Sequence, residues 1–188
     1  MSSFDLKYNP DEVIVSVGFF AAPEIKYLYK KTPPKYLEAY DPRPDVYNEY
    51  LKLRVPNFEP ILMGVLGEPR EAYLNLKKAS STLCLPHKSK QPVETVSLTY
   101  VTNTIVKKYG IIDRLLMNCE GSEIDIIQKT PSKILECYKY ILVSFHLFAE
   151  LLNISDEDYK NCLDKLSLTH TGELRHKTRF WWEFKRNG

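Results

Sequence analysis

Short apolar runs alternate with amphipathic segments along the first part of the chain. Residues 12–18, EVIVSVG, form a β-branched run that ends in glycine, the pattern of a buried parallel strand that stops at a turn. Segment 23–30 has proline in its first turn and an acidic residue directly after it, which predicts a helix. A strand at 36–40 and a helix that opens at Pro44 repeat this unit, and a third strand is expected at 60–66. The alternation predicts right-handed crossovers and a parallel sheet.

The middle of the chain departs from this pattern. Residues 72–76 and 93–98 alternate between apolar and polar positions and are separated by a polar loop, which predicts an inserted antiparallel hairpin. A short helix at 102–109 is expected to stop at Gly110, since glycine adopts the left-handed conformation at little cost. The fourth core strand is then expected at 111–119.

The last third returns to helix and strand patterns. Ser122 and Asp125 have the spacing of a capping box, so a helix is expected to begin there. Residues 138–148 form a long apolar strand, and Ser155 is expected to cap another helix. The run 173–184 alternates and predicts an antiparallel strand that closes the sheet.

Length and composition narrow the class of protein. The 188 residues fit one domain, and no repeat or linker divides them, so residues 1–188 are expected to form a single domain. With 26 basic and 24 acidic side chains, the net charge of +2 gives no general attraction for nucleic acid or for an anionic membrane. The N-terminus has no signal-peptide pattern, and a cytoplasmic protein is expected. The four cysteines lack zinc-ligand spacing, so no metal site is expected.

Polar residues and glycines follow several of the expected strands. Ligands of open parallel sheets bind outside the carboxyl ends of the strands, and Gly18, Asp41 and the segment 118–121 fall at such ends. An acid after the second strand is placed to accept hydrogen bonds from both ribose hydroxyls of a nucleoside cofactor, while Gly18 permits close approach to the backbone. Alternatively, Asp41 only starts a turn in Asp-Pro-Arg-Pro.

The stretch LLMNCEGSEIDII resembles the hallmark of the FkbM family of S-adenosylmethionine-dependent methyltransferases, approximately L-K-I-D-V-E-G-x-E before an apolar helix. Glu120, Gly121 and Glu123 match it residue for residue. Four further landmarks occur in the family's order. EAYDPRPDVY is similar to its Phe-Glu-Pro-x-Pro segment with Asp41 in place of Glu, ILMGVLGEPREAYLNL to its Ala-Val-Gly stretch and hairpin, ASSTL to its Ser-Ser-Leu turn, and LVSFH to its strand ending in an acid and His.

This resemblance implies a fold, a cofactor and a set of site residues. The fold would be an α/β Rossmann-like methyltransferase fold, a mostly parallel sheet with helices on both faces, and the cofactor would be S-adenosylmethionine. Methyl transfer needs the acceptor to be aligned with the sulfonium and, for a hydroxyl, its proton to be removed. Glu120 and His146 would face the acceptor as the catalytic residues. The cofactor residues would be Gly18, Glu24, Asp41, Met63, Gly64 and Asn118. Of these, Met63 and Gly64 would line the adenine.

Four residues of these motifs also have plain structural interpretations. Glu120 and Glu123 flank a helix start, where the helix dipole favours acids, and this accounts for Glu123 in particular. Asn118 is able to bond turn backbone instead of a ligand. His146 lies in an apolar run, where histidines are commonly part of the core.

Departures from the family pattern leave three functions open. The first motif, usually Asp-x-Gly-Ala-Asn-x-Gly, is Ser16 to Ala22 here, and Phe19 and Phe20 are expected to crowd the cofactor's amino-acid moiety. The leading hypothesis is O-methylation of a small molecule or sugar. The second is a catalytically degenerate binding or scaffold protein of the same fold. The third, a nucleic-acid methyltransferase, would use a basic patch at 175–186 despite the low net charge, and a homodimer is left open.

Overall fold

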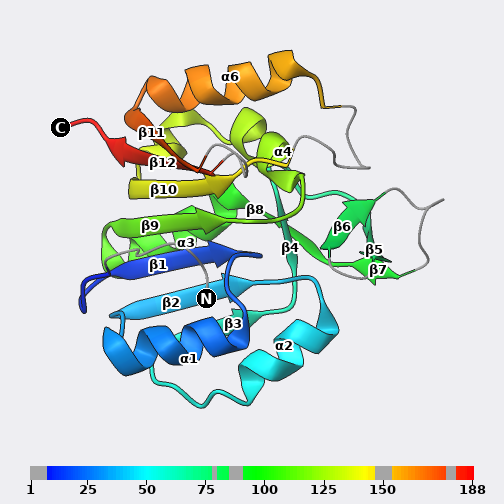
Figure 1. Cartoon of the computed structure of the whole chain (residues 1–188), viewed down its shortest axis with the longest axis vertical. Helices are drawn as coiled ribbons and strands as arrows, with labels where there is room; N and C mark the ends of the chain where they lie inside the picture. The colour runs from blue at the N-terminus through cyan, green and yellow to red at the C-terminus, as the bar shows by residue number, and fades with distance from the viewer. Residues whose placement is uncertain (1–7, 78–79, 85–90, 147–153, 177–180) are drawn as a thin grey trace.

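A mostly parallel sheet of seven strands, in the order β11-β12-β10-β9-β1-β2-β3, runs through the computed structural model (Figure 1). The structure describes residues 8–77, 80–84, 91–146, 154–176 and 181–188. The strands of this sheet are β1 (Val13–Val17), β2 (Tyr36–Tyr40), β3 (Phe58–Ile61), β9 (Ile112–Met117), β10 (Tyr138–Ser144), β11 (His170–His176) and β12 (Trp181–Arg186). Five are parallel, whereas β12 pairs antiparallel with β10 and β11.

Helices cover both faces of the sheet and create two apolar cores. Helices α1 (Ala22–Lys31) and α2 (Pro44–Leu51) pack on one face, where Ile14 and Leu37 point. Helices α3 (Leu98–Tyr109), α4 (Ser122–Lys129), α5 (Ser132–Leu135) and α6 (Asp156–Ser167) pack on the other, where Val13 and Val15 point. A strand buried on both faces favours apolar residues on both of them, which explains why four of the five residues of β1, VIVSV, are Val or Ile. The predicted α/β architecture is confirmed.

An insert lies between β3 and α3, beyond the carboxyl ends of the main strands (Figure 1). It contains a parallel pair, β4 (Gly64–Leu66) with β8 (Thr95–Ser97), and an antiparallel sheet of β5 (Ala72–Lys77), β6 (Ser80–Cys84) and β7 (Pro92–Val93). The inserted antiparallel hairpin is therefore present, but β5 pairs mainly with β6. The predicted single strand 60–66 is wrong, because its two halves, β3 and β4, belong to different sheets.

Local interactions move several predicted boundaries. Helix α3 begins at Leu98 rather than at residue 102, because the Ser97 hydroxyl accepts a hydrogen bond from Tyr100 N at 3.1 Å and caps the helix. Strand β10 ends at Ser144, and the last two residues of the predicted strand 138–148 lie outside the described residues. The single closing strand predicted at 173–184 is two strands, β11 and β12.

The predicted capping box at Ser122 and the predicted cap at Ser155 have opposite outcomes. At α6, Ser155 Oγ accepts from Asp158 N at 3.1 Å and Asp158 Oδ2 accepts from Ser155 N at 2.9 Å, as expected. At α4, the cap position is occupied by Gly121, with φ of +105°, and Ser122 is the first helical residue. The Asp125 carboxylate turns away from that cap and accepts from Gly67 N at 2.9 Å, so this predicted box is wrong.

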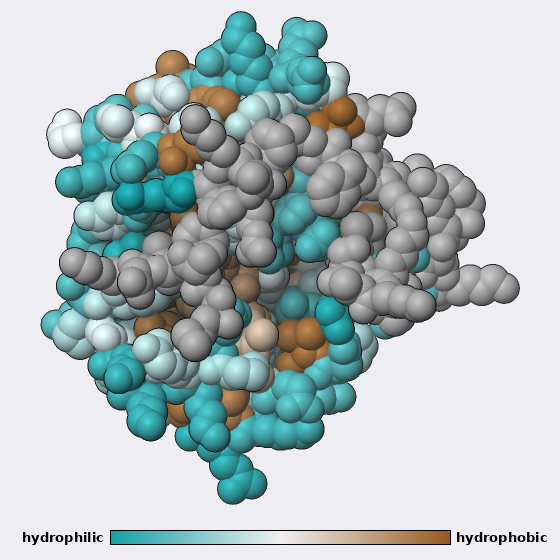
Figure 2. Space-filling model, in the orientation of Figure 1, coloured by the Kyte–Doolittle hydropathy of each residue, from teal (hydrophilic) through white to brown (hydrophobic). Residues whose placement is uncertain are grey.

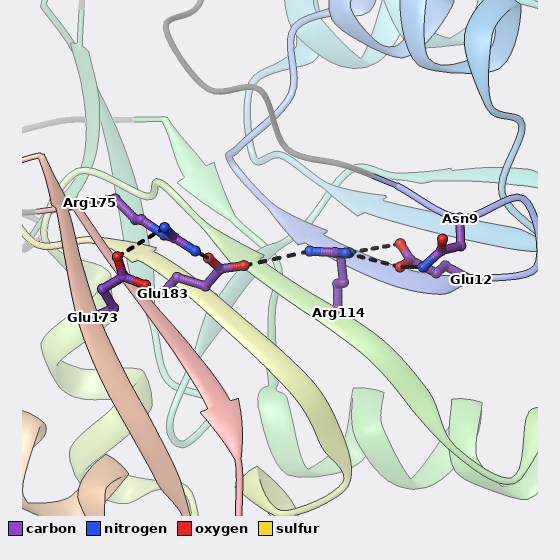
Figure 3. Close-up of polar contacts among 6 residues, drawn as sticks. All are labelled: Asn9, Glu12, Arg114, Glu173, Arg175 and Glu183. Carbon is purple, nitrogen blue, oxygen red and sulfur yellow. Dashed lines mark hydrogen bonds and ion pairs between the residues drawn. The ribbon is translucent and has the colours of Figure 1, made fainter.

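A network of ion pairs lies across the sheet near β1, β9, β11 and β12 (Figure 3). Arg114 Nε and Nη2 donate to Glu12 at 2.7 and 3.0 Å, and Arg114 Nη1 lies 3.8 Å from Glu183 Oε1. Glu183 in turn binds Arg175. The Arg114 guanidinium also lies 4.8 Å from the Tyr140 ring centre. This network links strands that are far apart in the sequence.

The hydropathy of the surface and of the helices completes the description of the fold. Among the coloured residues of the face seen in Figure 1, Figure 2 shows mainly hydrophilic ones, with apolar residues in small separate patches. Among the described residues, no helix combines the length and the apolar character that crossing a membrane requires.

Candidate functional site

A cavity of about 390 Å³ opens where the strand order reverses, at the carboxyl ends of β1 and β9. Open α/β sheets bind their ligands at this point. The cavity is lined by all the residues that the sequence assigned to the cofactor, together with Glu120, namely Gly18, Glu24, Asp41, Met63, Gly64, Asn118 and Glu120. His146 is not part of the lining but contacts Glu120. The structure thus brings the predicted site residues together.

Gly18 allows the loops after β1 and β9 to meet. Its φ is +61°, and its amide donates to Tyr40 O at 2.9 Å. A Cβ at this position would lie 2.8 Å from Asn118 O, which is closer than real Cβ contacts. Glycine is therefore required by the backbone itself, and the bare backbone also borders the cavity.

Asp41 serves the turn and leaves an oxygen at the cavity wall. Its Oδ1 accepts from Arg43 N at 2.9 Å, so the turn interpretation is present in the structure. Oδ2 accepts no hydrogen bond from the described part of the chain. Burial raises the pKa of Asp41 to about 6, against the lowering effects of the Arg43 amide and guanidinium. Above that pH the free oxygen is a charged acceptor for a ligand hydroxyl.

Glu24, Met63, Gly64 and Asn118 complete the predicted cofactor wall. The Glu24 carboxylate accepts from Ala21 N at 2.8 Å and so caps α1 while it lines the cavity. Met63 is partly buried against the core, between β3 and β4. The backbone N–H of Asn118 donates to Val17 O at 3.0 Å, and Asn118 also lines the cavity. Two of these residues thus have a structural role beside the predicted one.

Phe19 and Phe20 pack sideways and do not close the cavity. Phe19 makes edge-on contacts with Phe20, at 4.9 Å between ring centres, and with Trp181 at 5.5 Å. Phe20 is buried, and its carbonyl accepts a hydrogen bond from the Tyr50 hydroxyl. Both phenylalanines border the cavity, yet its volume remains open. Their expected crowding of the cofactor's amino-acid moiety stays a prediction, since both rings line the cavity.

A cluster of two carboxylates and one imidazole lies at the β9 side of the cavity. Glu123 is fully buried, and its carboxylate accepts from Cys119 N at 2.6 Å and from Gly121 N at 2.7 Å. The same carboxylate lies 2.9 Å from His146 Nδ1, while His146 Nε2 lies 3.7 Å from Glu120 Oε1. The sequence indicated only a helix-dipole role for Glu123, whereas the structure shows these three hydrogen-bond contacts as well. The only sequence signal for this role was its match to the last Glu of the FkbM hallmark.

The charges in this cluster alter its proton affinities. Burial acts to lower the pKa of His146, but the hydrogen bond with Glu123 and the charges of Glu123 and Glu120 outweigh burial and raise it. Burial also raises the pKa of Glu120, with His146 opposing the shift. Raised values on a carboxyl and an imidazole in contact are suited to general acid–base chemistry. Within the described ranges, no group of three or more His, Cys, Asp or Glu is placed to hold a metal ion.

Of the comparisons with known proteins, the one with solved structures finds matches, and these concern the fold. No protein-family model matches the sequence, and no curated protein sequence matches it. Among solved structures, the fibrillarin pre-rRNA processing protein of Methanococcus jannaschii is similar, with a TM-score of 0.50 and 13% identity over 96% of this chain and 68% of that chain. The fold is that of Rossmann-like methyltransferases.

Two further solved structures are similar to this chain, with lower TM-scores. An rRNA methylase from Streptococcus thermophilus has a TM-score of 0.48 and 10% identity, over 96% of this chain and 89% of that chain. TrmK of M. capricolum, in complex with S-adenosylhomocysteine, has a TM-score of 0.48 and 15% identity, over 95% of this chain and 64% of that chain. At these identities the likeness concerns the fold alone, and the FkbM resemblance stays a prediction.

Proposed function

We propose that this chain is an S-adenosylmethionine-dependent methyltransferase. The observation that carries the proposal is the open cavity at the strand-order reversal, which Gly18 and Asp41 line together. S-adenosylmethionine supplies an electrophilic methyl group. Asp41 Oδ2 would accept from the ribose hydroxyls, the Gly18 backbone would allow the cofactor close, and Met63 with Gly64 would line the adenine. The residues present fit this cofactor, because the acid, the bare backbone and the apolar wall occur at one cavity.

The acceptor would enter at the β9 side, beside Glu120. For a hydroxyl acceptor, the Glu120 carboxylate or the His146 imidazole would take the proton as the oxygen attacks the methyl group. Glu120 borders the cavity and His146 lies behind it, so a proton taken by Glu120 has a neighbouring group to which it can pass. Alignment of the acceptor by the cavity walls supplies the remaining advantage.

We further propose that the acceptor is a small molecule or a sugar and that the product is an O-methyl ether. The support is the cavity volume, the proton-accepting pair and a net charge of only +2. The similar structure of fibrillarin is that of a pre-rRNA processing protein, so RNA is the acceptor against which this proposal must be tested. The alternative of a degenerate scaffold is opposed by the open cavity.

Calorimetry with S-adenosylmethionine and S-adenosylhomocysteine tests the cofactor directly. The wild-type chain should bind both, and Asp41→Asn should bind at least about tenfold more weakly, since charge-assisted hydrogen bonds to the ribose are lost. Asp45→Asn is the matched control, because Asp45 is an exposed acid of the same turn whose partner is Arg43. Absence of wild-type binding up to millimolar ligand would refute the proposal.

Transfer of a labelled methyl group tests the acceptor. Hydroxylated small molecules and sugars form one set of acceptors, and RNA forms another. Labelling in the first set that Glu120→Gln abolishes would support the proposal. Labelling of RNA alone would replace the acceptor class, and cofactor binding without transfer to either set would favour the scaffold function.

A further inference from the structure

Glu123 is a fully buried residue whose carboxylate contacts the His146 ring directly. The same carboxylate binds the backbone amides of Cys119 and Gly121, which flank Glu120 in the chain. We propose that Glu123 is a positioning residue, whose carboxylate holds Glu120 and His146 in the relative orientation that proton transfer requires. This inference rests on the proposed function, because it assigns the pair to the proton of the acceptor. Glu123 itself has no exposed surface and is not part of the cavity lining.

The first step is a two-point hold on Glu120. One oxygen of Glu123 binds the amide of Cys119 and the other binds the amide of Gly121, so the two hydrogen bonds flank Glu120 in the chain. Glu120 has a φ of +50°, a left-handed conformation that is strained for a residue with a Cβ. Such conformations persist when the surrounding contacts determine them. The carboxylate of Glu123 supplies these contacts and so keeps the Glu120 side chain at the cavity wall.

The second step concerns the imidazole. An ionised carboxylate only accepts hydrogen bonds, so the contact of 2.9 Å requires His146 to donate from Nδ1 to Glu123. The neutral ring then has its lone pair on Nε2, which is the atom 3.7 Å from Glu120 Oε1. Glu123 therefore selects the tautomer whose basic nitrogen faces Glu120. The gap of 3.7 Å is longer than a hydrogen bond, as is common before an acceptor is bound.

Capping alone does not explain this arrangement. A helix start needs an acceptor for its free amides, and a side chain that fulfils this need does not have to contact a residue in another strand. Glu123 makes such a contact with His146, which follows β10. Asp125, two residues further along α4, offers a comparison, because it is equally enclosed but binds Gly67, Arg70 and Lys129.

The experiment compares the titration of His146 in the full-length wild-type chain with that in two variants. NMR of labelled histidines follows the titration, and His146→Gln assigns the signal of His146. In Glu123→Gln the pKa of His146 should fall, since a neutral amide replaces the nearest charge. The charge of Glu120 and the hydrogen bond with the Ser144 backbone also raise this pKa, and both remain in the variant. Asp125→Asn should leave the titration of His146 unchanged. An unchanged titration in folded Glu123→Gln would overturn the inference.

A measurement on the wild-type chain covers the case in which Glu123→Gln does not fold. The nitrogen chemical shifts of neutral His146 should report a proton on Nδ1, and a proton on Nε2 would overturn the inference. Neither measurement needs a cofactor. Failure of the proposed function would appear separately, as absence of S-adenosylmethionine binding by the wild-type chain. The Glu123→Gln variant should bind S-adenosylhomocysteine within about threefold of the wild type, because Asp41 and Gly18 are unchanged.

Discussion

Asp41 shows at the scale of one residue how binding and stability oppose each other. Burial raises the pKa of its carboxyl to about 6, so the folded chain holds the proton more tightly than the unfolded chain does. The contribution of Asp41 to the free energy of unfolding therefore falls as the pH rises from about 4, the ordinary value for Asp, through about 6. At neutral pH the charged side chain weakens the fold, whereas in the proposed function the same charge would strengthen the hydrogen bonds from a ribose.

Asp41→Asn should therefore stabilise the chain at pH 7.5, by about 1 to 2 kcal/mol, and this gain should disappear near pH 4. The amide oxygen of Asn is still able to accept from Arg43 N, so the turn is preserved. Urea unfolding at the two pH values measures the difference. Asp45→Asn should behave in the opposite sense at neutral pH, because the hydrogen bond with Arg43 lowers the pKa of Asp45. A destabilised Asp41→Asn at pH 7.5 would contradict this account.

Gly18 offers a second test at this scale. Gly18→Ala would place a Cβ 2.8 Å from Asn118 O and force a left-handed φ on alanine, so a loss of about 2 kcal/mol or more is expected in the free energy of unfolding. Gly110→Ala is the matched control, because its φ is +84° but its Cβ would meet no atom within 4 Å. The control should lose only about 1 kcal/mol, the cost of the backbone conformation. Equal losses in the two variants would show that the contact with Asn118 is unimportant.

At the scale of elements, the ion-pair network of Figure 3 joins the start of β1 to β9 and β12. Glu12 and Arg114 are both nearly enclosed, and the ring of Tyr140 lies against the guanidinium. Such a pair contributes little beyond what an apolar pair of the same shape would. Removal of one partner, by contrast, leaves the other charge buried.

Arg114→Met should lower the free energy of unfolding by about 3 to 5 kcal/mol, since Glu12 would lose its buried partner. The double variant Glu12→Gln with Arg114→Met should recover a large part of this loss, because no buried charge remains. Guanidinium unfolding of the wild type, both single variants and the double variant completes the cycle. Additive losses in the double variant would contradict the assignment.

Patterns within one element were enough to predict most elements of the fold. Four of the five residues of β1, VIVSV, are apolar, so its burial on both faces follows from the sequence. Alternation of such runs with helices then puts the carboxyl ends at one edge, which is why Gly18, Asp41 and Glu120 were predicted to meet. The division of segment 60–66 was not predicted, because both halves are apolar and only pairing with other strands separates β3 from β4.

The part of the site that escaped prediction depends on tertiary contacts. The partners of Glu123 lie in the loop before α4 and after β10, and no pattern within α4 distinguishes its contact with His146 from a helix-dipole role. Ser122 likewise had the spacing of a cap, but the left-handed Gly121 occupies the cap position instead. Side-chain partners that are distant in sequence are set by the fold as a whole.

At the scale of the whole molecule, α4 connects the two sides of the cavity. Glu123 in its first turn binds the loop of Glu120, and Asp125 in the same turn binds Gly67 and Arg70 of the insert. A Cβ on Gly67 would lie 2.5 Å from Asp125 O, so the insert rests directly on the helix. The first turn of α4 is thus bonded both to the insert and to the loop that carries Glu120, so a displacement of one wall of the cavity is transmitted to the other wall through this turn.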